Sequence, residues 1–231
     1  MVGHEGSILC SAYSQDLGML VTGSDDCTLR LWPVTEAVDS EPAGGIPGEH
    51  EDDHGEHEGG ASGGRRGSRG GGLEDDGESL ELRGHEARVT AVVDLGDHML
   101  ASVSHDMTLR FWDLHTRHEM HCTHRAHDHP IHSVEHADAR EEVATAAADP
   151  VVKVWAAFKP FALKGVLAGH HGNVTAVKWC EWRMLWITAA DDHTIRLWNP
   201  DTGETLRCLS MRGEAVTTMI VDAVNRCLVV P

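Results

Sequence analysis

The sequence predicts an all-β fold in which one unit of about 42 residues repeats. Four stretches share a pattern in which apolar and polar residues alternate up to a tryptophan: GSDDCTLRLW, VSHDMTLRFW, AAADPVVKVW and AADDHTIRLW. A histidine precedes these tryptophans by 28, 27, 28 and 28 residues. Successive histidines lie 81, 42 and 43 residues apart, and the first interval becomes regular when about 40 residues of an acidic insertion are set aside. Strand-like alternation at this period indicates one four-stranded sheet in each unit.

Each unit also carries a hydroxyl residue four positions before an aspartate, between the histidine and the tryptophan. The four quartets are His4, Thr22, Asp26 and Trp32; His85, Ser102, Asp106 and Trp112; His127, Thr145, Asp149 and Trp155; and His170, Thr188, Asp192 and Trp198. On these residues the chain resembles the WD40 repeat family, over essentially everything except the insertion. The resemblance implies a WD40-type β-propeller arc of about four four-stranded blades plus an incomplete fifth. It also implies a chain of hydrogen bonds in each blade, from the tryptophan through the hydroxyl and the histidine to the aspartate, which serves as scaffolding and not as catalysis.

Period-two patterning and turn residues place the strands of each blade in order. We expect three inner strands and then an outer one in every blade. The inner strands are expected near 7–13, 18–24 and 27–32; 88–95, 98–104 and 107–113; 130–136, 141–147 and 151–157; and 173–179, 184–190 and 194–199. The outer strands are expected near 79–83, 117–124, 162–168 and 204–210. The insertion then falls between the third and fourth strands of the first blade.

These strands divide the chain into a first repeat (1–35), an insertion (36–78), repeats two to four (79–210) and the start of a fifth repeat (211–231). In the fifth repeat, Arg212 takes the place of the histidine, 42 residues after His170. An open arc leaves sheet edges that can recruit other strands. Because the sequence stops in mid-strand, we expect a truncated form of a longer propeller. The alternative is closure by edge-strand association with another chain or a second copy.

The insertion differs in composition from the rest of the chain. Between Glu36 and Glu78 lie 13 acidic residues and three arginines, with many glycines and almost no apolar residues. Such a segment cannot bury enough apolar surface to offset the entropy of ordering, so we predict that it is disordered. Within it, RRGS matches the pattern preferred by basophilic kinases, which makes Ser68 a candidate phosphosite.

Composition narrows the classes of partner. The formal net charge of -18 argues against a general binder of nucleic acids or anionic membranes, because it repels phosphates. Six cysteines without a CxxC pair indicate reduced thiols in a cytoplasmic protein, with the nucleus as the alternative. The sequence shows no signal peptide and no stretch of about 18 apolar residues.

The WD40 resemblance implies that partners bind the rim formed by the loops before each first strand and the turns between the second and third strands. The candidate contacts there are Glu5, Ser7, Asp25, Glu86, Arg88, His105, Asp128, Pro130, His171, Asn173 and Asp191. This set is mostly acidic, which favours a Lys- or Arg-rich partner segment, and protonation of its histidines near pH 6 would weaken the attraction. Trp182, in the turn between two inner strands of the fourth blade, is a further candidate anchor, and packing against a neighbouring blade is its alternative role.

The function predicted from these features is a non-catalytic scaffold for protein–protein interactions in a larger assembly, without a cofactor. The alternative is a metal-binding or enzymatic propeller that uses the surplus histidines. Every-third spacing in HTRHEMHCTHRAHDHPIH sends successive rings to opposite faces of a strand, so at most partial metal sites are expected. The candidates are His129 with His132, His118 with Cys122, and loose chelation by His50, His54 and His57. The aspartic-protease triplet occurs once, at Asp201-Thr202-Gly203, whereas that chemistry needs two.

Overall fold

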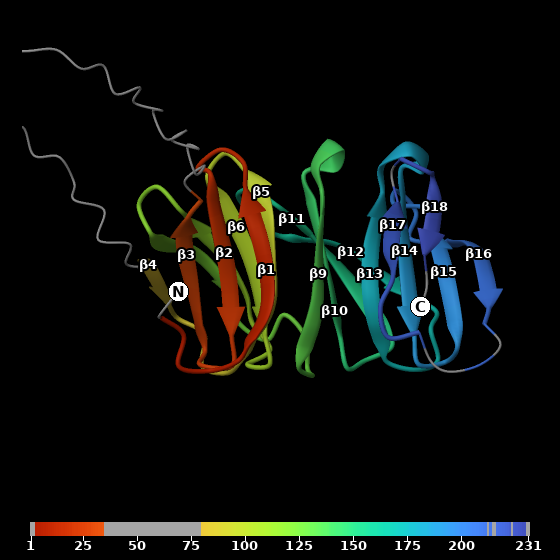
Figure 1. Ribbon diagram of the computed structural model, residues 1–231. Helices are drawn as coiled ribbons and strands as arrows, with labels where there is room; N and C mark the ends of the chain where they lie inside the picture. The colour runs from red at the N-terminus through yellow and green to blue at the C-terminus, as the bar shows by residue number, and fades with distance from the viewer. Residues whose placement is uncertain (1–2, 35–79, 212, 214–215, 223, 230–231) are drawn as a thin grey trace, which may run out of the picture. The chain divides into compact units, whose positions relative to one another are not determined.

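The computed structural model describes residues 3–34, 80–211, 213, 216–222 and 224–229. These residues form four four-stranded antiparallel sheets and one two-stranded sheet (Figure 1). They belong to one compact unit, residues 1–34 and 77–231, whereas Thr35–Asp76 form a second unit that lies outside the described residues. The predicted all-β class with repeated four-stranded sheets is therefore confirmed. The predicted disorder of residues 36–78 lies outside the described residues and stays a prediction.

Consecutive strands pair with each other, so every sheet is an antiparallel meander. Sheet one contains β1 (Ile8–Ser14), β2 (Met19–Ser24), β3 (Thr28–Pro33) and β4 (Leu80–Arg83). Sheet two contains β5 (Val89–Gly96), β6 (Met99–Ser104), β7 (Leu109–Asp113) and β8 (His118–Thr123). Sheet three contains β9 (Ile131–Ala137), β10 (Glu142–Ala147), β11 (Val151–Ala156) and β12 (Leu163–Ala168). Sheet four contains β13 (Val174–Cys180), β14 (Leu185–Ala190), β15 (Thr194–Trp198) and β16 (Thr205–Ser210), and sheet five contains β17 (Ile220–Asp222) and β18 (Cys227–Val229).

The strand boundaries lie within two residues of those expected from the sequence for the four-stranded sheets. The outer strand of sheet one, β4, pairs with β3 in the register Thr28↔Arg83 to Leu31↔Leu80. Residues 36–78 therefore connect the third and fourth strands of this sheet. Two short 3-10 helices, Asp138–Arg140 and Glu181–Arg183, join the first and second strands of sheets three and four. None of the helices in the described residues has the length and apolar character needed to cross a membrane.

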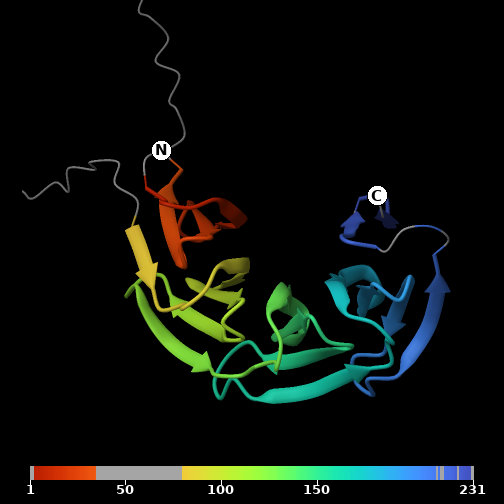
Figure 2. The ribbon, with the colours of Figure 1, turned by 90° about the horizontal axis from the view of Figure 1, so that it is seen from below.

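The core lies between consecutive sheets, which Figure 2 shows side by side in chain order. Alternate residues of a strand point to opposite faces, so the inner strands of a sheet that lies between two others can pack against both. Val21 and Leu31 of sheet one form a buried cluster with Leu100 and Trp112 of sheet two. Equivalent clusters lie between sheets two and three, three and four, and four and five. The periodic apolar pattern of the sequence thus becomes a series of inter-sheet cores.

Close packing between sheets one and two explains why residue 23 is a glycine. A Cβ atom on Gly23 would lie 2.6 Å from Cys10 Sγ and 2.8 Å from Val89 Cγ1, so a larger residue cannot fit without moving a neighbouring strand. Burial at this contact raises the pKa of the Cys10 thiol to about 12. Each of the six cysteines is a free thiol. Cys10 is therefore protonated at neutral pH and acts as a small apolar residue.

Candidate protein-binding surface

A chain of hydrogen bonds, here called the relay, joins the four quartet residues in each four-stranded sheet. In sheet one, Trp32 Nε1 donates to Thr22 Oγ1 over 2.8 Å, and the same oxygen lies 2.8 Å from His4 Nε2. His4 Nδ1 lies 2.8 Å from Asp26 Oδ2. The Trp–hydroxyl distances in sheets two to four are 2.8, 2.9 and 2.7 Å, and the His–Asp distances are 2.9, 2.8 and 3.0 Å. The structure thus brings together all sixteen quartet residues, four in each sheet.

Both ring nitrogens of each relay histidine have a hydrogen-bond partner. Because the tryptophan N–H donates to the hydroxyl oxygen, the hydroxyl proton is free to donate to Nε2 of the histidine. With the hydroxyl in that orientation, Nδ1–H donates to the aspartate, the histidine is neutral and the carboxylate is ionised. In sheet four, burial lowers the pKa of His170 despite the opposing effect of Asp192. Both ring nitrogens of each relay histidine are engaged, so none of the four is available as a general base.

In sheets one, two and four the relay carboxylates also hold the loop before the first strand. Asp26 accepts hydrogen bonds from the backbone N–H groups of Glu5 and Thr28, both at 2.9 Å, and from the Thr28 hydroxyl at 2.6 Å. Burial alone would raise the pKa of Asp26, but the bonds from Thr28, His4 and the backbone outweigh it and hold the pKa well below its usual range. The pKa values of Asp106 and Asp192 are lowered in the same way. The carboxylate is therefore a charged anchor between the loop before the first strand and the turn after the second.

Sheet three departs from this pattern for a local reason. Its turn contains Pro150 where the other sheets have Cys27, Met107 and His193, which adopt φ values of 68°, 67° and 59°. Proline cannot adopt a positive φ, so the turn takes another conformation. The next residue is Val151, at the position of Thr28, and it offers Asp149 only its backbone N–H, at 3.1 Å. The carboxylate of sheet three thus lacks two bonds that its counterparts receive, one from a threonine hydroxyl and one from a loop backbone N–H.

A backbone hydrogen bond closes the same end of all four sheets. In each case the N–H of the turn between the second and third strands donates to a carbonyl of the loop before the first strand. The four bonds are Asp25 to Ser7 (2.9 Å), His105 to Arg88 (3.2 Å), Ala148 to Pro130 (3.1 Å) and Asp191 to Asn173 (3.0 Å). The candidate rim residues of each sheet are therefore neighbours at one end of that sheet, although the bonded partners are 17 or 18 positions apart in the sequence.

Most carboxylates of this rim face solvent. Glu5, Glu86, Asp128 and Asp191 are exposed, as are His171 and Asn173. The side chain of Asp25 is 42% exposed and forms an ion pair of 3.1 Å with Arg88 of the next sheet. Asn173 Nδ2 donates to Asp191 Oδ2 over 3.1 Å. The rim thus presents five carboxylates, of which Asp25 is partly neutralised by the only rim arginine.

The pKa of His105 does not fit the prediction that the rim histidines become protonated near pH 6. It is half-buried, and burial is the largest effect that lowers its pKa; the positive charge of Arg88 adds to it. Its protonation therefore requires a lower pH than that of an ordinary histidine.

The family comparison agrees with this geometry. The sequence matches the WD40 family, described as "WD domain, G-beta repeat", over residues 1–33, 78–113 and 161–199. The chain belongs to the WD40 repeat family. The matched ranges leave out 114–160, the stretch that contains the sheet-three relay with Pro150 and Val151.

Several curated WD40-repeat proteins are similar to this WD40 chain. "Protein transport protein SEC31" of Yarrowia lipolytica is 35% identical over 123 residues, which are 51% of this chain and 10% of the relative. "Nuclear distribution protein nudF" of Aspergillus niger is 29% identical over 117 residues, or 49% of this chain and 26% of the relative. "Telomerase protein component 1" of Mus musculus is 30% identical over 213 residues, or 85% of this chain and 8% of the relative. The WD40 chain therefore spans about a quarter or less of each of these relatives.

Trp182 lies at the other end of its sheet from the rim of the WD40 repeats. It is in the 3-10 turn Glu181–Arg183, and its ring is half-buried against the cluster that contains Cys180, Leu185 and Met219. The structure therefore shows a packing contact for Trp182, and its role as a partner anchor stays a prediction. Trp179 and Trp186 lie in the core between sheets three and four, in edge-to-face contact with ring centroids 4.8 Å apart.

The surplus histidines of the WD40 chain are dispersed. No group of three or more His, Cys, Asp or Glu side chains that could hold a metal lies within the part of the chain that the structure describes. His132 instead approaches the Val174 carbonyl of the next sheet, with Nε2 2.6 Å from the oxygen. His118 and Cys122 begin and nearly end β8, facing Asp113 and Arg110 of β7. The candidates His50, His54, His57 and Ser68 lie outside the described residues.

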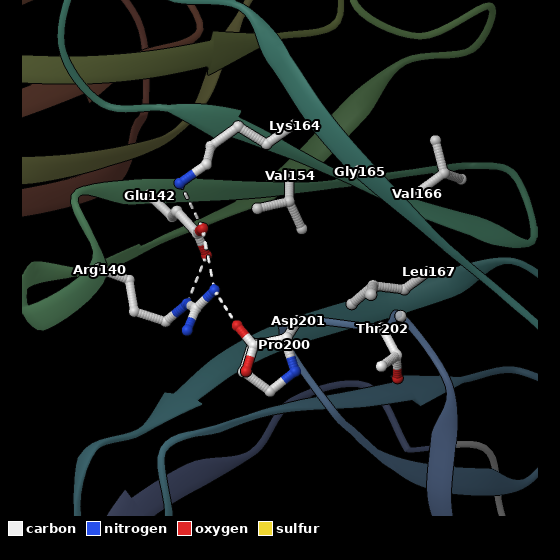
Figure 3. Close-up of a pocket in the computed structure, with 11 residues that line it drawn as sticks. Arg140, Glu142, Val154, Lys164, Gly165, Val166, Leu167, Pro200, Asp201 and Thr202 are labelled. Carbon is white, nitrogen blue, oxygen red and sulfur yellow. Dashed lines mark hydrogen bonds and ion pairs between the residues drawn. The ribbon is translucent and has the colours of Figure 1, made fainter.

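A charged pocket at the opposite end from the rim is a feature that sequence reasoning missed. It has a volume of about 310 Å³ and lies between β12 and the turn Pro200–Gly203 (Figure 3). Glu142, whose side chain is 3% exposed, contacts Lys164 Nζ at 2.6 Å and Arg140 Nε at 2.9 Å. Arg140 Nη2 also pairs with Asp201 Oδ1 at 2.9 Å, which ties sheet three to sheet four. The protease-like triplet is thus part of an ion-pair network and a turn.

The position of Glu142 suggests how the sequence could have shown this pocket. By strand register, Glu142 is equivalent to Met19, Met99 and Leu185 of the other sheets. A single charged residue, at a buried position that is apolar in the other three sheets, indicates that an oppositely charged side chain lies next to it. The partners themselves could not be found, since Asp201 is 61 residues from Arg140.

We expect opposite effects from two substitutions in this pocket. Glu142→Met restores the apolar residue of the other repeats, and the freed Arg140 and Lys164 side chains reach solvent, so the free energy of unfolding should stay within about 1 kcal/mol of wild type or rise. Arg140→Ala leaves Glu142 with one cation fewer and should cost about 1–3 kcal/mol. Urea unfolding followed by tryptophan fluorescence measures both. A larger loss for Glu142→Met than for Arg140→Ala would contradict this account.

Proposed function

We propose that this WD40 chain is a non-catalytic scaffold, whose acidic rim binds a Lys- or Arg-rich segment of a partner protein within a larger assembly. One observation supports this most: relays and backbone hydrogen bonds hold exposed carboxylates at the equivalent end of successive sheets. Proteins of this family generally bind other proteins, and a fixed surface of like charges suits an extended segment of opposite charge.

The chemistry of the rim favours a basic protein segment over other ligands. Glu5, Glu86, Asp128 and Asp191 carry charge that the described residues do not neutralise with a direct ion pair. The net charge of -18 adds a long-range attraction for cations and a repulsion for phosphates. Such steering weakens as salt is added, because exposed charges are screened beyond about 8 Å at physiological ionic strength.

The relay histidines support a role without catalysis. Their ring nitrogens contact a hydroxyl and a carboxylate within the sheet, and the imidazoles of His85, His127 and His170 are buried. A general base needs a free nitrogen in reach of a substrate proton. The alternative function, a metal-dependent propeller, predicts stoichiometric zinc that survives dialysis of the purified protein.

The six free thiols support a cytoplasmic location, with the nucleus as the alternative. The expectation of a longer propeller stays a prediction.

The acidic rim predicts a specific binding defect. We expect the double charge reversal Asp25→Lys with Asp191→Lys to weaken binding of an arginine- and lysine-rich peptide roughly tenfold, because each exposed charge pair contributes on the order of 0.2–1 kcal/mol and reversal replaces attraction with repulsion. Fluorescence anisotropy of a labelled peptide measures the affinity. A peptide of equal length with glutamate in place of its basic residues should not bind.

Asp138→Lys, compared with the single rim reversal Asp191→Lys, is the matched control for charge. Asp138 is exposed and begins the 3-10 turn at the other end of sheet three, so its reversal changes the net charge without touching the rim. This variant should bind the basic peptide within about twofold of wild type. Equal weakening by the control, or undiminished binding by the rim variant, would show that the rim is not the binding surface.

A further inference from the structure

Two departures from the repeat meet in the charged pocket of sheet three (Figure 3). One is Glu142, the buried charge at a position that is apolar in the other four-stranded sheets. The other is Gly165, which pairs with Val154 across β11 and β12. The residues at the corresponding place on the other outer strands all have side chains: Leu80, His121 and Arg207. Among the four-stranded sheets that the structure describes, only sheet three thus combines a buried charge with a missing side chain.

The missing side chain leaves the pocket open. In sheet two, His121 fills the equivalent place and stacks on Phe161 of sheet three, with ring centroids 5.0 Å apart. A Cβ atom on Gly165 would have no neighbour within 4 Å, and the backbone there has no positive φ that would require glycine. Cross-strand partners point to the same face, so this Cβ atom would lie beside Val154, which lines the pocket. The pocket of about 310 Å³ is therefore open in part because residue 165 is a glycine.

The cations of the pocket have more hydrogen-bond donors than the neighbouring carboxylates use. A lysine ammonium has three donors and an arginine guanidinium has five. Within the described residues, Lys164 Nζ contacts only Glu142, at 2.6 Å. Arg140 uses Nε and Nη2 to bond Glu142 and Asp201, and its Nη1 forms no bond to this part of the chain. The surplus donors suit a ligand that brings acceptors, and a carboxylate offers two oxygens in the geometry that a guanidinium prefers.

An apolar wall lies next to these cations. Val154 and Leu167 belong to the cluster between sheets three and four, and both line the pocket beside the ion-pair network (Figure 3). A ligand that uses both features needs a carboxylate and a short aliphatic group attached close together. The C-terminal residue of a protein has this arrangement, because its α-carboxylate and its side chain are bonded to the same carbon atom. The volume is near the lower end of the range for ligand pockets, about 300–1,000 Å³, which suits a single residue.

We propose that this pocket binds the C-terminal residue of a partner protein. The α-carboxylate lies between Lys164 and Arg140, and an aliphatic side chain such as that of leucine packs against Val154 and Leu167. The preceding residues of the partner leave the pocket along β12, an edge strand to which no further strand pairs in the described part of the chain. Capture of a terminal carboxylate is a recurrent mode of peptide recognition. The contact lies at the opposite end from the acidic rim and takes a ligand of opposite charge, so it goes beyond the proposed function and does not depend on it.

A peptide with a free C-terminus tests the ligand. The probe is dye-labelled Gly-Ser-Gly-Ser-Gly-Leu, titrated with the whole chain and followed by fluorescence anisotropy at about 150 mM salt, which screens the repulsion from the acidic chain. The same peptide with a C-terminal amide should bind at least about tenfold more weakly, because it loses charge-assisted hydrogen bonds from two cations. A free peptide that does not bind, or equal binding of both forms, would overturn the proposal. N-acetyl-leucine that binds as tightly as the peptide would show instead a site for free small acids, and would refute the assignment to a partner protein.

Two variants test whether the peptide occupies this pocket. Gly165→Leu fills the space and keeps every charged residue, so the free peptide should bind at least about tenfold more weakly. Lys164→Gln removes one of the two cations and should weaken binding about five- to tenfold. Lys159→Gln is the matched control, because Lys159 is exposed and does not line the pocket, and it should bind within about twofold of wild type.

Circular dichroism checks the fold of each variant, and Lys164→Gln carries the test by itself if Gly165→Leu does not fold. Undiminished binding by a folded pocket variant, or equal weakening by the control, would place the peptide elsewhere on the chain and reject the pocket as its site.

Discussion

Trp198→Ala should lower the free energy of unfolding by about 3–5 kcal/mol, the range for removing a large aromatic side chain from a core. Trp198 is 0% exposed, and its Nε1 donates to Thr188 Oγ1 over 2.7 Å. The truncation removes ring contacts with His170, whose centroid lies 6.0 Å away, and leaves the Thr188 oxygen without its donor. Both losses fall in the cluster between sheets three and four, so we expect the whole unfolding transition to shift to lower urea concentration.

Trp182→Ala is the matched control for this substitution. It removes the same side chain from the half-buried 3-10 turn of the same sheet, where the indole has no hydrogen bond within the described residues. Its cost should be less than half that of Trp198→Ala, because less apolar area is buried and no polar partner is stranded. Equal losses for both variants would mean that the relay adds nothing to the packing of the ring.

Asp106→Asn should lower the free energy of unfolding at pH 7 by about 2–4 kcal/mol. Hydrogen bonds to a charged group contribute about 1.5–3 kcal/mol each, and the amide NH₂ of asparagine would face at least one N–H or O–H donor that now binds the carboxylate. Asp106 accepts from His85 Nδ1 at 2.9 Å, from the backbone N–H of Glu86 at 2.9 Å, and from the hydroxyl of Thr108 at 2.6 Å. The asparagine amide keeps the shape of the carboxylate but only one of its two acceptor atoms. Chemical unfolding at pH 7 measures the loss.

The same substitution should change how stability depends on pH. Burial would raise the pKa of Asp106, but hydrogen bonds from His85 and Thr108 outweigh burial and lower the pKa in the folded state. The unfolded chain therefore binds protons before the folded chain as pH falls below about 4, and the stability contributed by this carboxylate is progressively lost. In Asp106→Asn nothing titrates at this position. The loss of stability between about pH 5 and pH 2 should therefore be shallower than in wild type.

Asp149→Asn in sheet three is the internal comparison. Asp149 accepts from His127 and from the Val151 backbone, and Val151 supplies no hydroxyl. The loss at pH 7 should therefore be smaller than that of Asp106→Asn. A loss of equal size would show that the threonine hydroxyl and the loop N–H, neither of which Asp149 receives, together contribute little to the relay.

The repeat pattern of the sequence was enough to predict most of the fold. Four histidines and four tryptophans at constant spacing, with a hydroxyl and an aspartate between them, marked every sheet and every relay. Local alternation also placed the strands, because one face of each strand must be apolar to pack against a neighbouring sheet. The quartets lie together in the structure because each is contained within about 29 residues of one sheet.

Contacts between sheets could not be read in this way. The ion pair of Asp25 with Arg88, and that of Arg140 with Asp201, join residues 63 and 61 positions apart on different sheets. Nothing in the local pattern sets which charges meet, because that depends on how adjacent sheets pack. The half-burial of Trp182 and the lowered pKa of His105 have the same origin.

The sequence by itself determined that this chain repeats one hydrogen-bonded sheet unit, since the unit is encoded by residues close together in the chain. Only the tertiary structure decided how adjacent copies of that unit pack, and so how far the apolar residue at the start of each first strand is covered. Ile8 and Val174 occupy the same place in the repeat and carry similar apolar side chains, yet one is 57% exposed and the other 0%. Burial is a property of what packs against a residue, and sequence spacing within one unit does not contain that information.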